Sequence, residues 1–427
     1  MSSARVIRRL LSAGAAFALA LGASQAAAAG FDTPILYTAR HQAMGGAAIG
    51  YVDDPSAGFH NPAGLQGVRG LGLLGDFSLI LGKVQGSPFS TPTAHNLESK
   101  LVVAPFFLLG GAYRVHEWVT VGLAAFPVAS GGAEYEYDIG TLHAKDSTEI
   151  VFFEATPLVS LNVPEDRWLP GKLAFGAGYR ASMVMFDRVQ GDAKDPQLLD
   201  LSLSGFNWAG VRLGVQYSPV DALKLGVVFR NKIVVKTTAD TGTVGGAEAS
   251  DGQLKFRLPA KLGFGARFDW ARVGVASDVE WAFQSQNTRS HLTGTLHYPN
   301  GDVQPADKVN VFDWQNGVTW RLGFEYRLGA HPLVPLRIGY IYDTKVTNKA
   351  YPSAFGTPPA PTHTLTAGAG YVAEHWQVNL AASRRFGSAA HVDASELGTG
   401  CNFCGFAGDY KITMTGLYID ASVDLPR

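Results

Sequence analysis

The sequence predicts an all-β fold: a transmembrane antiparallel β-barrel of about 14 strands with an N-terminal hatch inside its lumen. Three observations lead to this prediction. Apolar and polar residues alternate along most of the chain, the connections between alternating segments are by turns short and long, and the segment before the first strand does not alternate. Period-two alternation with short turns on one side, long loops on the other and an even strand number is typical of outer-membrane barrels.

Composition narrows the protein class. The chain has 427 residues, of which 46% are hydrophobic and 17% charged, with 50 glycines and a formal net charge of -1. This apolar content with so little net charge excludes a disordered chain. After the N-terminal region no apolar run reaches the roughly 18 to 20 residues that a membrane-spanning helix needs. A neutral chain also lacks the basic stripe of a nucleic-acid-binding protein, so we expect no nucleic-acid partner.

Residues 1–29 are predicted to be a secretory signal peptide. They begin with basic residues (Arg5, Arg8 and Arg9), continue with an apolar middle and end in small residues at positions 26–29. This three-part order is that of a cleaved signal, and the apolar part is too short for a stable membrane span. An N-terminal anchor helix is the alternative.

Residues 70–427 are predicted to form the barrel. Along residues 417–425, Leu, Ile, Ala, Val and Leu face one side, while Tyr, Asp, Ser and Asp face the other. Such alternation describes a strand with one face in an apolar medium and one in a polar medium. The same pattern occurs at residues 223–230, 273–284, 336–342 and 376–380. A soluble, secreted β-sandwich would also alternate, but with strands of only about 5 or 6 residues.

The connections support a barrel because their lengths alternate. Short ones lie near residues 115–118, 218–221, 270–271, 329–333 and 373–375, with one of intermediate length at 164–170. Long polar ones are predicted at residues 82–99, 132–147, 189–200, 239–250, 290–308, 347–362 and 387–409. Tryptophans near strand ends are typical of the two membrane interfaces. They are Trp118, Trp168, Trp208, Trp270, Trp281, Trp314, Trp320 and Trp376.

Residues 30–69 are predicted to form the hatch. This segment does not alternate; it is rich in Gly and Ala, and it carries Asp53-Asp54 followed by Asn61-Pro62-Ala63. A compact plug of about this size would close a barrel too wide for side chains alone to fill. Asn forms Asx-turns and Pro fixes φ, so Asn61, Pro62 and Ala63 are expected to anchor the hatch to the barrel wall, with any gating a by-product of anchorage. Asp53 and Asp54 are expected to belong to the same anchor or gate.

In these features the chain resembles the FadL-type outer-membrane transporters of long-chain fatty acids and other hydrophobic compounds. The resemblance is carried by Gly30-Phe31, the Met-Gly-Gly-Ala stretch at residues 44–47, Asp53-Asp54, Asn61-Pro62-Ala63 and the late strands at residues 313–343. It implies a 14-stranded barrel that captures its substrate among the outer loops. The substrate would move to an internal pocket that touches the extreme N-terminus, where we expect Phe31 to contact it.

The resemblance also implies a sideways exit through an inward kink of the third strand, which we expect at about residues 118–132. We predict the kink in the upper part of this strand, because Pro removes a donor from the ladder and Gly weakens strand pairing. The alternative is a strand that ends in a loop at Pro127. The expected lateral opening consists of Phe126, Pro127, Ser130, Gly131 and Gly132.

The charge of the substrate is left open by the sequence. Arg188 occupies a segment like the one that supplies a basic pocket residue in the family, and a carboxylate would bind such a group. Pairing of Arg188 with Asp187 or with an acid of another strand is the alternative. Where the family pattern leads us to expect Lys, between Trp314 and Trp320, this chain has Gln315, which can bind a substrate but carries no charge. Neutral hydrophobic substrates therefore remain possible.

Cys401 and Cys404 are expected to form a local disulfide, since no second Cys pair completes a zinc site. No Gly-x-Ser-x-Gly elbow, His-Glu-x-x-His or Walker loop occurs, so we expect no enzyme, no cofactor and no metal. Three functions remain: a channel for hydrophobic compounds, a non-transporting barrel that serves as a scaffold or shuttle in protein secretion, and an outer-membrane lipid hydrolase. The expected partners are a hydrophobic small molecule and outer-membrane lipids, with the chain as a monomer.

Overall fold

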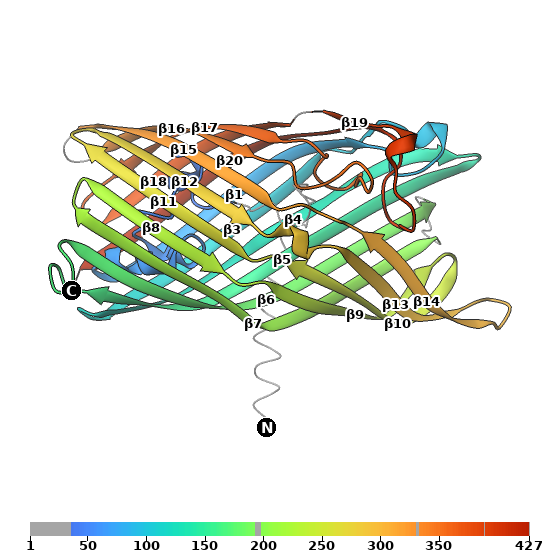
Figure 1. Cartoon of the computed structure of the whole chain (residues 1–427), viewed down its shortest axis with the longest axis horizontal. Helices are drawn as coiled ribbons and strands as arrows, with labels where there is room; N and C mark the ends of the chain where they lie inside the picture. Colours follow the sequence, from blue (N-terminus) through green and yellow to red (C-terminus); the bar gives the residue numbers. More distant parts are fainter. Residues whose placement is uncertain (1–35, 193–197, 330–332, 388, 427) are drawn as a thin grey trace, which may run out of the picture.

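The computed structural model describes residues 36–192, 198–329, 333–387 and 389–426, which form one closed antiparallel barrel around a short N-terminal segment (Figure 1). The predicted signal peptide and Phe31 lie outside the described residues. The strands are β1 (Gly70–Gly86), β2 (Leu97–Glu98), β3 (Val102–His116), β4 (Val119–Ile139), β5 (Leu142–Val163), β6 (Lys172–Asp192), β7 (Leu199–Val220), β8 (Leu223–Arg230), β9 (Ile233–Val244), β10 (Ala247–Leu258), β11 (Lys261–Trp270), β12 (Val273–Ala282), β13 (Arg289–His297), β14 (Val303–Val311), β15 (Gly317–Leu328), β16 (Val334–Asp343), β17 (Thr362–Val372), β18 (Trp376–Gly387), β19 (Ala390–Val392) and β20 (Gly408–Pro426).

Closure of the sheet confirms the predicted barrel. β1 pairs with β3 on one side and with β20 on the other, from Gly70 opposite Pro426 to Gln85 opposite Lys411. Four wall strands are interrupted and appear as the pairs β8 and β9, β10 and β11, β12 and β13, and β14 and β15, so the described residues form a barrel of 14 strands. A sheet that closes on itself leaves no edge to be satisfied in hydrocarbon.

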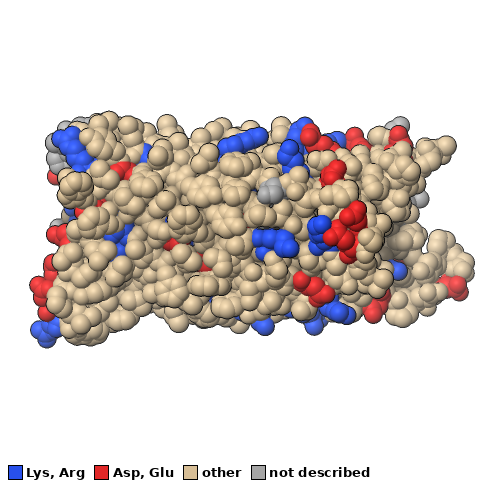
Figure 2. All heavy atoms as spheres, turned by 45° about the horizontal axis from the view of Figure 1, so that its top comes forward, with Lys and Arg blue, Asp and Glu red and all other residues tan. Residues whose placement is uncertain are grey.

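Alternate strand residues point outward and remain exposed, as the sequence pattern predicts. In β16 the exposed fraction of Leu336 is 46% and that of Ile338 is 61%, whereas Arg337 between them is buried. Figure 2 shows an uncharged band on the outer surface between charged groups toward the two ends. This distribution suits a surface that faces lipid around its middle. No helix in the described ranges is long and apolar enough to cross a bilayer.

Several of the predicted long connections are shorter than expected, because strand pairing continues beyond the apolar band, whereas those at residues 347–362 and 387–409 remain long. Residues 132–147 are predicted to be a polar loop, but β4 extends to Ile139 and β5 begins at Leu142, with Gly140 and Thr141 as the turn. Residues 239–250 likewise form the hairpin of β9 and β10 around Gly245 and Gly246. A ladder in water does not need apolar alternation, so the pattern that locates strands ends before the strands do.

The hatch lies at the end of the barrel where β1 begins and β20 ends, called here the hatch end; the opposite end, with the long hairpins, is called the loop end (Figure 1). The helices of the hatch are α2 (Ala39–Gln42), η2 (Pro55–Gly58) and η3 (Pro62–Gly67). Elsewhere the chain has the 3₁₀ turns η4 (Pro92–Ala94), η5 (Gln284–Gln286) and η6 (Ala394–Glu396). Nearly all hatch residues from Tyr37 to Leu65 are buried.

Glycines on the inner face of the wall let the hatch backbone approach the strands closely. A Cβ at Gly176 would overlap the backbone of Pro62 and Ala63, and one at Gly339 would overlap Met44 and Gly45. Gly214, Gly226 and Gly323 lie against the hatch in the same way. Side chains at these positions would push the hatch off the wall, which gives the glycines within strands a packing role.

Candidate functional site

The strand β4, the third strand of the barrel wall, is irregular along part of its length. Its register with β5 shifts between Pro127 and Ala129, and Gly132 has a φ of 158°. All residues from 126 to 133 are buried, so the in-and-out alternation of the strand is lost here. β4 nevertheless continues to Ile139, so the alternative that the strand ends at Pro127 is wrong. A register shift of this kind bends a strand locally.

The bend leaves a window in the wall between β3 and β4. The ladder of β3 with β4 runs from His116–Val119 only to Leu109–Ala125, although β3 stays paired with β1 as far as Val102. Toward the loop end the two strand regions meet again, where the N–H of Lys100 donates to the carbonyl of Glu134 at 2.9 Å. The window is therefore bordered by residues 102–108 and 126–133 and closed at both ends.

Aromatic residues lie on both sides of the window. On the outer side the rings of Phe107 in β3 and Phe153 in β5 are 6.1 Å apart, so they meet across the withdrawn β4. On the inner side the hydroxyl of Tyr37 donates to the carbonyl of Pro127 at 2.9 Å. Phe59 of the hatch packs against Phe126 with ring centroids 5.4 Å apart. The hatch thus supports the bent part of β4 directly.

An apolar cavity opens toward the loop end beside the bent strand. It encloses about 1050 Å³ of space not filled by atoms, part of which is open to solvent. Gly131 of β4 lines it, together with Arg188 of β6 and residues of the loop at 347–357. Its aromatic lining consists of Phe186, Phe256, Phe312, Trp314, Tyr351, Phe355 and Phe403. A largely apolar concave site with few polar groups is typical of small-molecule binding.

Arg188 lines the cavity, but its charge is paired. Its Nη1 donates to the fully buried carboxylate of Asp146 on β5 and to the carbonyl oxygens of Ser147 at 2.9 Å and Val189 at 3.0 Å. The guanidinium also lies 4.7 Å from the ring centroid of Phe355. The structure therefore shows the alternative that the sequence leaves open: Arg188 pairs with an acid of another strand.

Gln315 does not reach the cavity. Its side chain is exposed and donates to the carbonyl of Lys345 at 2.8 Å. The neighbouring Trp314 is buried and lines the cavity, so its expected place in an interfacial belt is wrong. Trp314 lies in residues 312–316, which belong to neither β14 nor β15 and so carry no in-and-out alternation.

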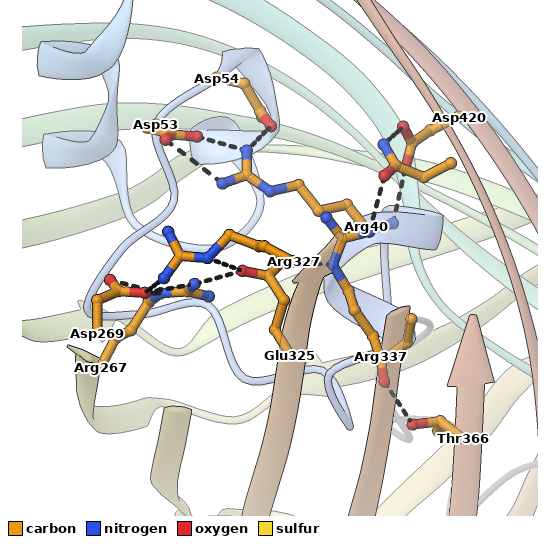
Figure 3. Close-up of polar contacts among 12 residues, drawn as sticks. Arg40, Asp53, Asp54, Arg267, Asp269, Glu325, Arg327, Arg337, Thr366 and Asp420 are labelled. Carbon is orange, nitrogen blue, oxygen red and sulfur yellow. Dashed lines mark hydrogen bonds and ion pairs between the residues drawn. The ribbon is translucent and has the colours of Figure 1, made fainter. Parts of the chain in front are cut away.

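The acidic pair of the hatch binds Arg40, as Figure 3 shows. Nη1 of Arg40 lies 2.6 Å from Oδ1 of Asp53 and 3.6 Å from Oδ2 of Asp54, while its backbone N–H donates to Asp420 of β20 at 2.8 Å. Asp54 also caps η2 by accepting from the N–H of Ser56 at 2.8 Å. Burial raises the pKa of Asp54 to about 6. The pair therefore ties the hatch together rather than facing the cavity.

Asn61 joins the hatch to the barrel wall. Its Oδ1 accepts from the N–H of Ala63 at 3.2 Å, and its Nδ2 donates to the carbonyls of Ile49 at 2.8 Å, Val215 at 3.1 Å and Val227 at 3.3 Å. Pro62 begins η3 directly after it. Because Val215 and Val227 belong to β7 and β8, these contacts support the anchoring role expected from the sequence.

Ion pairs line the lumen around the hatch. Arg267 and Arg337 both bind Glu325, at 2.6 and 2.8 Å, and Arg327 binds Asp269 at 2.9 Å (Figure 3). Farther along the barrel, Glu154 binds Arg180 and Arg212 in a fully buried cluster. The lumen is thus polar and tightly paired at the hatch end.

Sequence reasoning missed the loop residues of the cavity. Tyr351, Phe355 and Phe403 lie in segments predicted to be polar loops, and the only sequence signal was aromatic side chains within otherwise polar stretches. Cys401 and Cys404 form a disulfide, and Cys404 lines the same cavity. No group of three or more His, Cys, Asp or Glu that could hold a metal occurs in the ranges that the structure describes.

Comparisons with known proteins agree with the barrel fold described above. A family model described as "Outer membrane protein transport protein (OMPP1/FadL/TodX)" matches residues 19–416. Among solved structures, a Pseudomonas aeruginosa FadL homologue superimposes with a TM-score of 0.67 at 17% identity, over 93% of this chain and 100% of that one. The Pseudomonas putida toluene transporter TodX gives 0.66 at 18% identity, over 92% and 99%. The Ralstonia pickettii toluene transporter TbuX gives 0.63 at 14%, over 93% and 99%. No curated protein sequence matches the chain significantly.

Proposed function

The chain belongs to the outer membrane protein transport protein (OMPP1/FadL/TodX) family of Gram-negative outer-membrane barrels, and we propose that it is a passive channel for small hydrophobic molecules. The molecule is captured in the apolar cavity at the loop end, passes the internal pocket near the N-terminus, where Phe31 is expected, and leaves sideways through the window between β3 and β4. The single observation that carries this proposal is the position of Gly131, which belongs both to the cavity lining and to the border of the window.

The contents of the barrel favour a sideways exit over a straight one. A molecule that continued along the lumen would meet the hatch and the ion pairs of Arg267, Glu325 and Arg337. It would then enter water, at a cost of roughly 0.8 kcal/mol for each CH₂ group. Exit through the window leads into the lipid. It avoids both the obstruction by the hatch and the transfer into water. Phe107 and Phe153 would have to move apart to let the molecule pass.

The pairing of Arg188 favours a neutral substrate over a fatty acid anion. Binding of a carboxylate would require Arg188 to leave the buried Asp146, which would then lose its charged partner. Removing one member of a buried ion pair costs about 3 to 5 kcal/mol. An apolar molecule in contact with Phe186, Phe256 and Trp314 demands no such exchange. We therefore propose uncharged hydrocarbons, including aromatic ones, as the substrate class.

The two other function classes are less well supported. A scaffold for protein secretion predicts a filled lumen, whereas the described residues leave an apolar cavity. A hydrolase predicts a Ser and a His in contact near the outer surface, and Oγ of Ser250 does lie 3.0 Å from Nε2 of His297. No ion pair of His297 with a carboxylate occurs in the part of the chain that the structure describes, and the family is one of non-enzymatic channels.

The experiment is uptake of radiolabelled toluene by cells that produce the protein. Gly131→Leu is expected to lower the initial rate at least about fivefold, because its side chain fills the path from cavity to window. Gly75→Leu is the matched control: Gly75 faces outward on β1, and a Cβ there has nothing nearer than the Leu109 side chain at 3.9 Å. Heat-modifiability gels confirm that both variants fold. An unchanged rate for Gly131→Leu would remove the window from the mechanism.

A further inference from the structure

Strand β14 has an edge that the barrel wall does not cover. β14 pairs with β13 along residues 303–311. The strand that would be its other neighbour, β16, pairs with β15 and β17 but not with β14, and it ends at Asp343. Asn402 lies along this edge instead. Its N–H donates to the carbonyl of Val309 at 2.7 Å, and its Oδ1 accepts from the N–H of Val309 at 2.7 Å. An open strand edge is a site for pairing with another chain, and Asn402 covers it.

The segment that covers the edge also forms part of the cavity wall. The disulfide between Cys401 and Cys404 closes a small ring that holds Asn402 and Phe403 between the two cysteines. Asn402 is exposed and binds β14, whereas Phe403 packs against the hydrophobic core and lines the cavity with Cys404. We call residues 401–404 the clip. Its two inner residues thus act on opposite sides, one on the strand edge and one on the cavity.

The chain on either side of the clip is fixed independently. Before it, the N–H of Gly398 donates to the carbonyl of Ala350 at 2.8 Å, and Lys349 binds Glu396 at 2.9 Å. After it, the N–H of Gly405 donates to the carbonyl of Pro352 at 2.7 Å. These bonds join the flanks to the loop at 347–357, which also lines the cavity. Opening the ring therefore changes the clip and leaves its attachments in place.

We propose that the clip is a redox-sensitive element that sets the width of the cavity, and hence the size of the molecule it admits. This inference rests on the proposed function. An external dithiol reduces the disulfide with two electrons and two protons, giving two cysteine thiols, and is itself oxidised to a disulfide. The freed residues regain backbone freedom, which opposes the hydrogen bonds that hold the clip to Val309 and Val311. Asn402 then leaves β14, and Phe403 leaves the cavity wall.

Hydrogen–deuterium exchange tests the clip without reference to transport. The amides of Val309 and Val311 bind Oδ1 of Asn402 and Sγ of Cys401, at 2.7 and 3.3 Å. In purified protein, dithiothreitol is expected to speed exchange within residues 303–311 at least about tenfold and to leave β15 unchanged, because local opening exposes only the edge. A Cys401→Ser, Cys404→Ser double variant should behave as the reduced protein does. Equal exchange in the oxidised and reduced states would overturn the proposal.

Uptake measurements then test the effect on size. The ratio of naphthalene to toluene uptake is expected to rise at least about threefold in the double variant and in Phe403→Ala, which keeps the disulfide. Dithiothreitol should raise the ratio for the wild type and leave the double variant unchanged. A ratio equal to that of the oxidised wild type in both variants would overturn the size-setting role. If cells that produce the wild type take up neither hydrocarbon faster than cells without the protein, the proposed function is wrong. The exchange experiment still shows whether reduction releases the clip from β14.

Discussion

The two halves of the lumen differ sharply within one regular wall. At the hatch end, charged groups such as Arg40, Arg267 and Glu325 are paired, and the hatch backbone touches the wall at its glycines. At the loop end, an apolar cavity lies beside a strand that has lost its register. The comparison shows a polar, ion-paired half and an apolar half. This difference supports the proposal that an apolar molecule leaves through the break in the wall and not along the lumen.

The largest effect on the difference between the two halves of the lumen is expected when the hatch is released from the wall. Gly339→Val places side-chain atoms where the backbone of Met44 and Gly45 lies, so the hatch cannot seat on β16. Without it a barrel of this width has an open lumen, and single-channel conductance in planar bilayers is expected to rise more than about tenfold. The control is Gly75→Val, on the outer face of β1, which should conduct as the wild type does. Unchanged conductance in folded Gly339→Val would show that the hatch is not the seal.

Freeing the cation of the cavity should give the loop-end half a charge preference. Asp146→Asn keeps the shape of the side chain but removes the anion that binds Arg188. The guanidinium can then bind a carboxylate, and laurate affinity is expected to rise about fivefold, or about 1 kcal/mol. Competition of laurate with a fluorescent apolar probe measures this effect, and toluene affinity should change little. If the wild type binds laurate as tightly as the variant, Arg188 is already available and the neutral-substrate proposal is wrong.

The smallest effect should come from Gln315, which the sequence predicts to bind the substrate and which the structure places outside the cavity. Gln315→Ala removes an exposed hydrogen bond to Lys345 and no cavity contact. The uptake rate should therefore stay the same, and the free energy of unfolding should change by less than about 0.5 kcal/mol. Trp314→Ala is the matched variant, because this buried neighbour lines the cavity, and it should lower toluene uptake severalfold. Equal loss in both variants would mean that the cavity extends to Gln315 and would contradict this prediction.

Much of the fold could be predicted because its cause is local. The alternation along residues 417–425 is required of any strand with one face in lipid and one in the lumen, so it identifies β20 without knowledge of its neighbours. The same reasoning ends the strands too early at residues 132–147. Beyond the membrane, β4 and β5 remain paired in water, where the sequence carries no such requirement.

The candidate site could be predicted only in part. Pro127 and the glycines at 131 and 132 indicate a weak place in a strand, because the missing donor and the missing side chains are properties of those residues themselves. The pairing of Arg188 with Asp146 could not be predicted, because it depends on the register of β5 against β6. Trp314 and Phe403 are far apart in the sequence, and only the fold makes both of them line the same cavity.

The sequence by itself determined a closed barrel of alternating strands with a glycine-rich segment before it, because the lipid and the lumen act on every strand in the same way. Only the tertiary structure decided that β4 leaves β3, that the hatch sits on the glycines of the wall, and that the clip lies on the edge of β14. The physical reason is that these features arise from which strand and loop lie side by side, and a period-two pattern contains no information about neighbours.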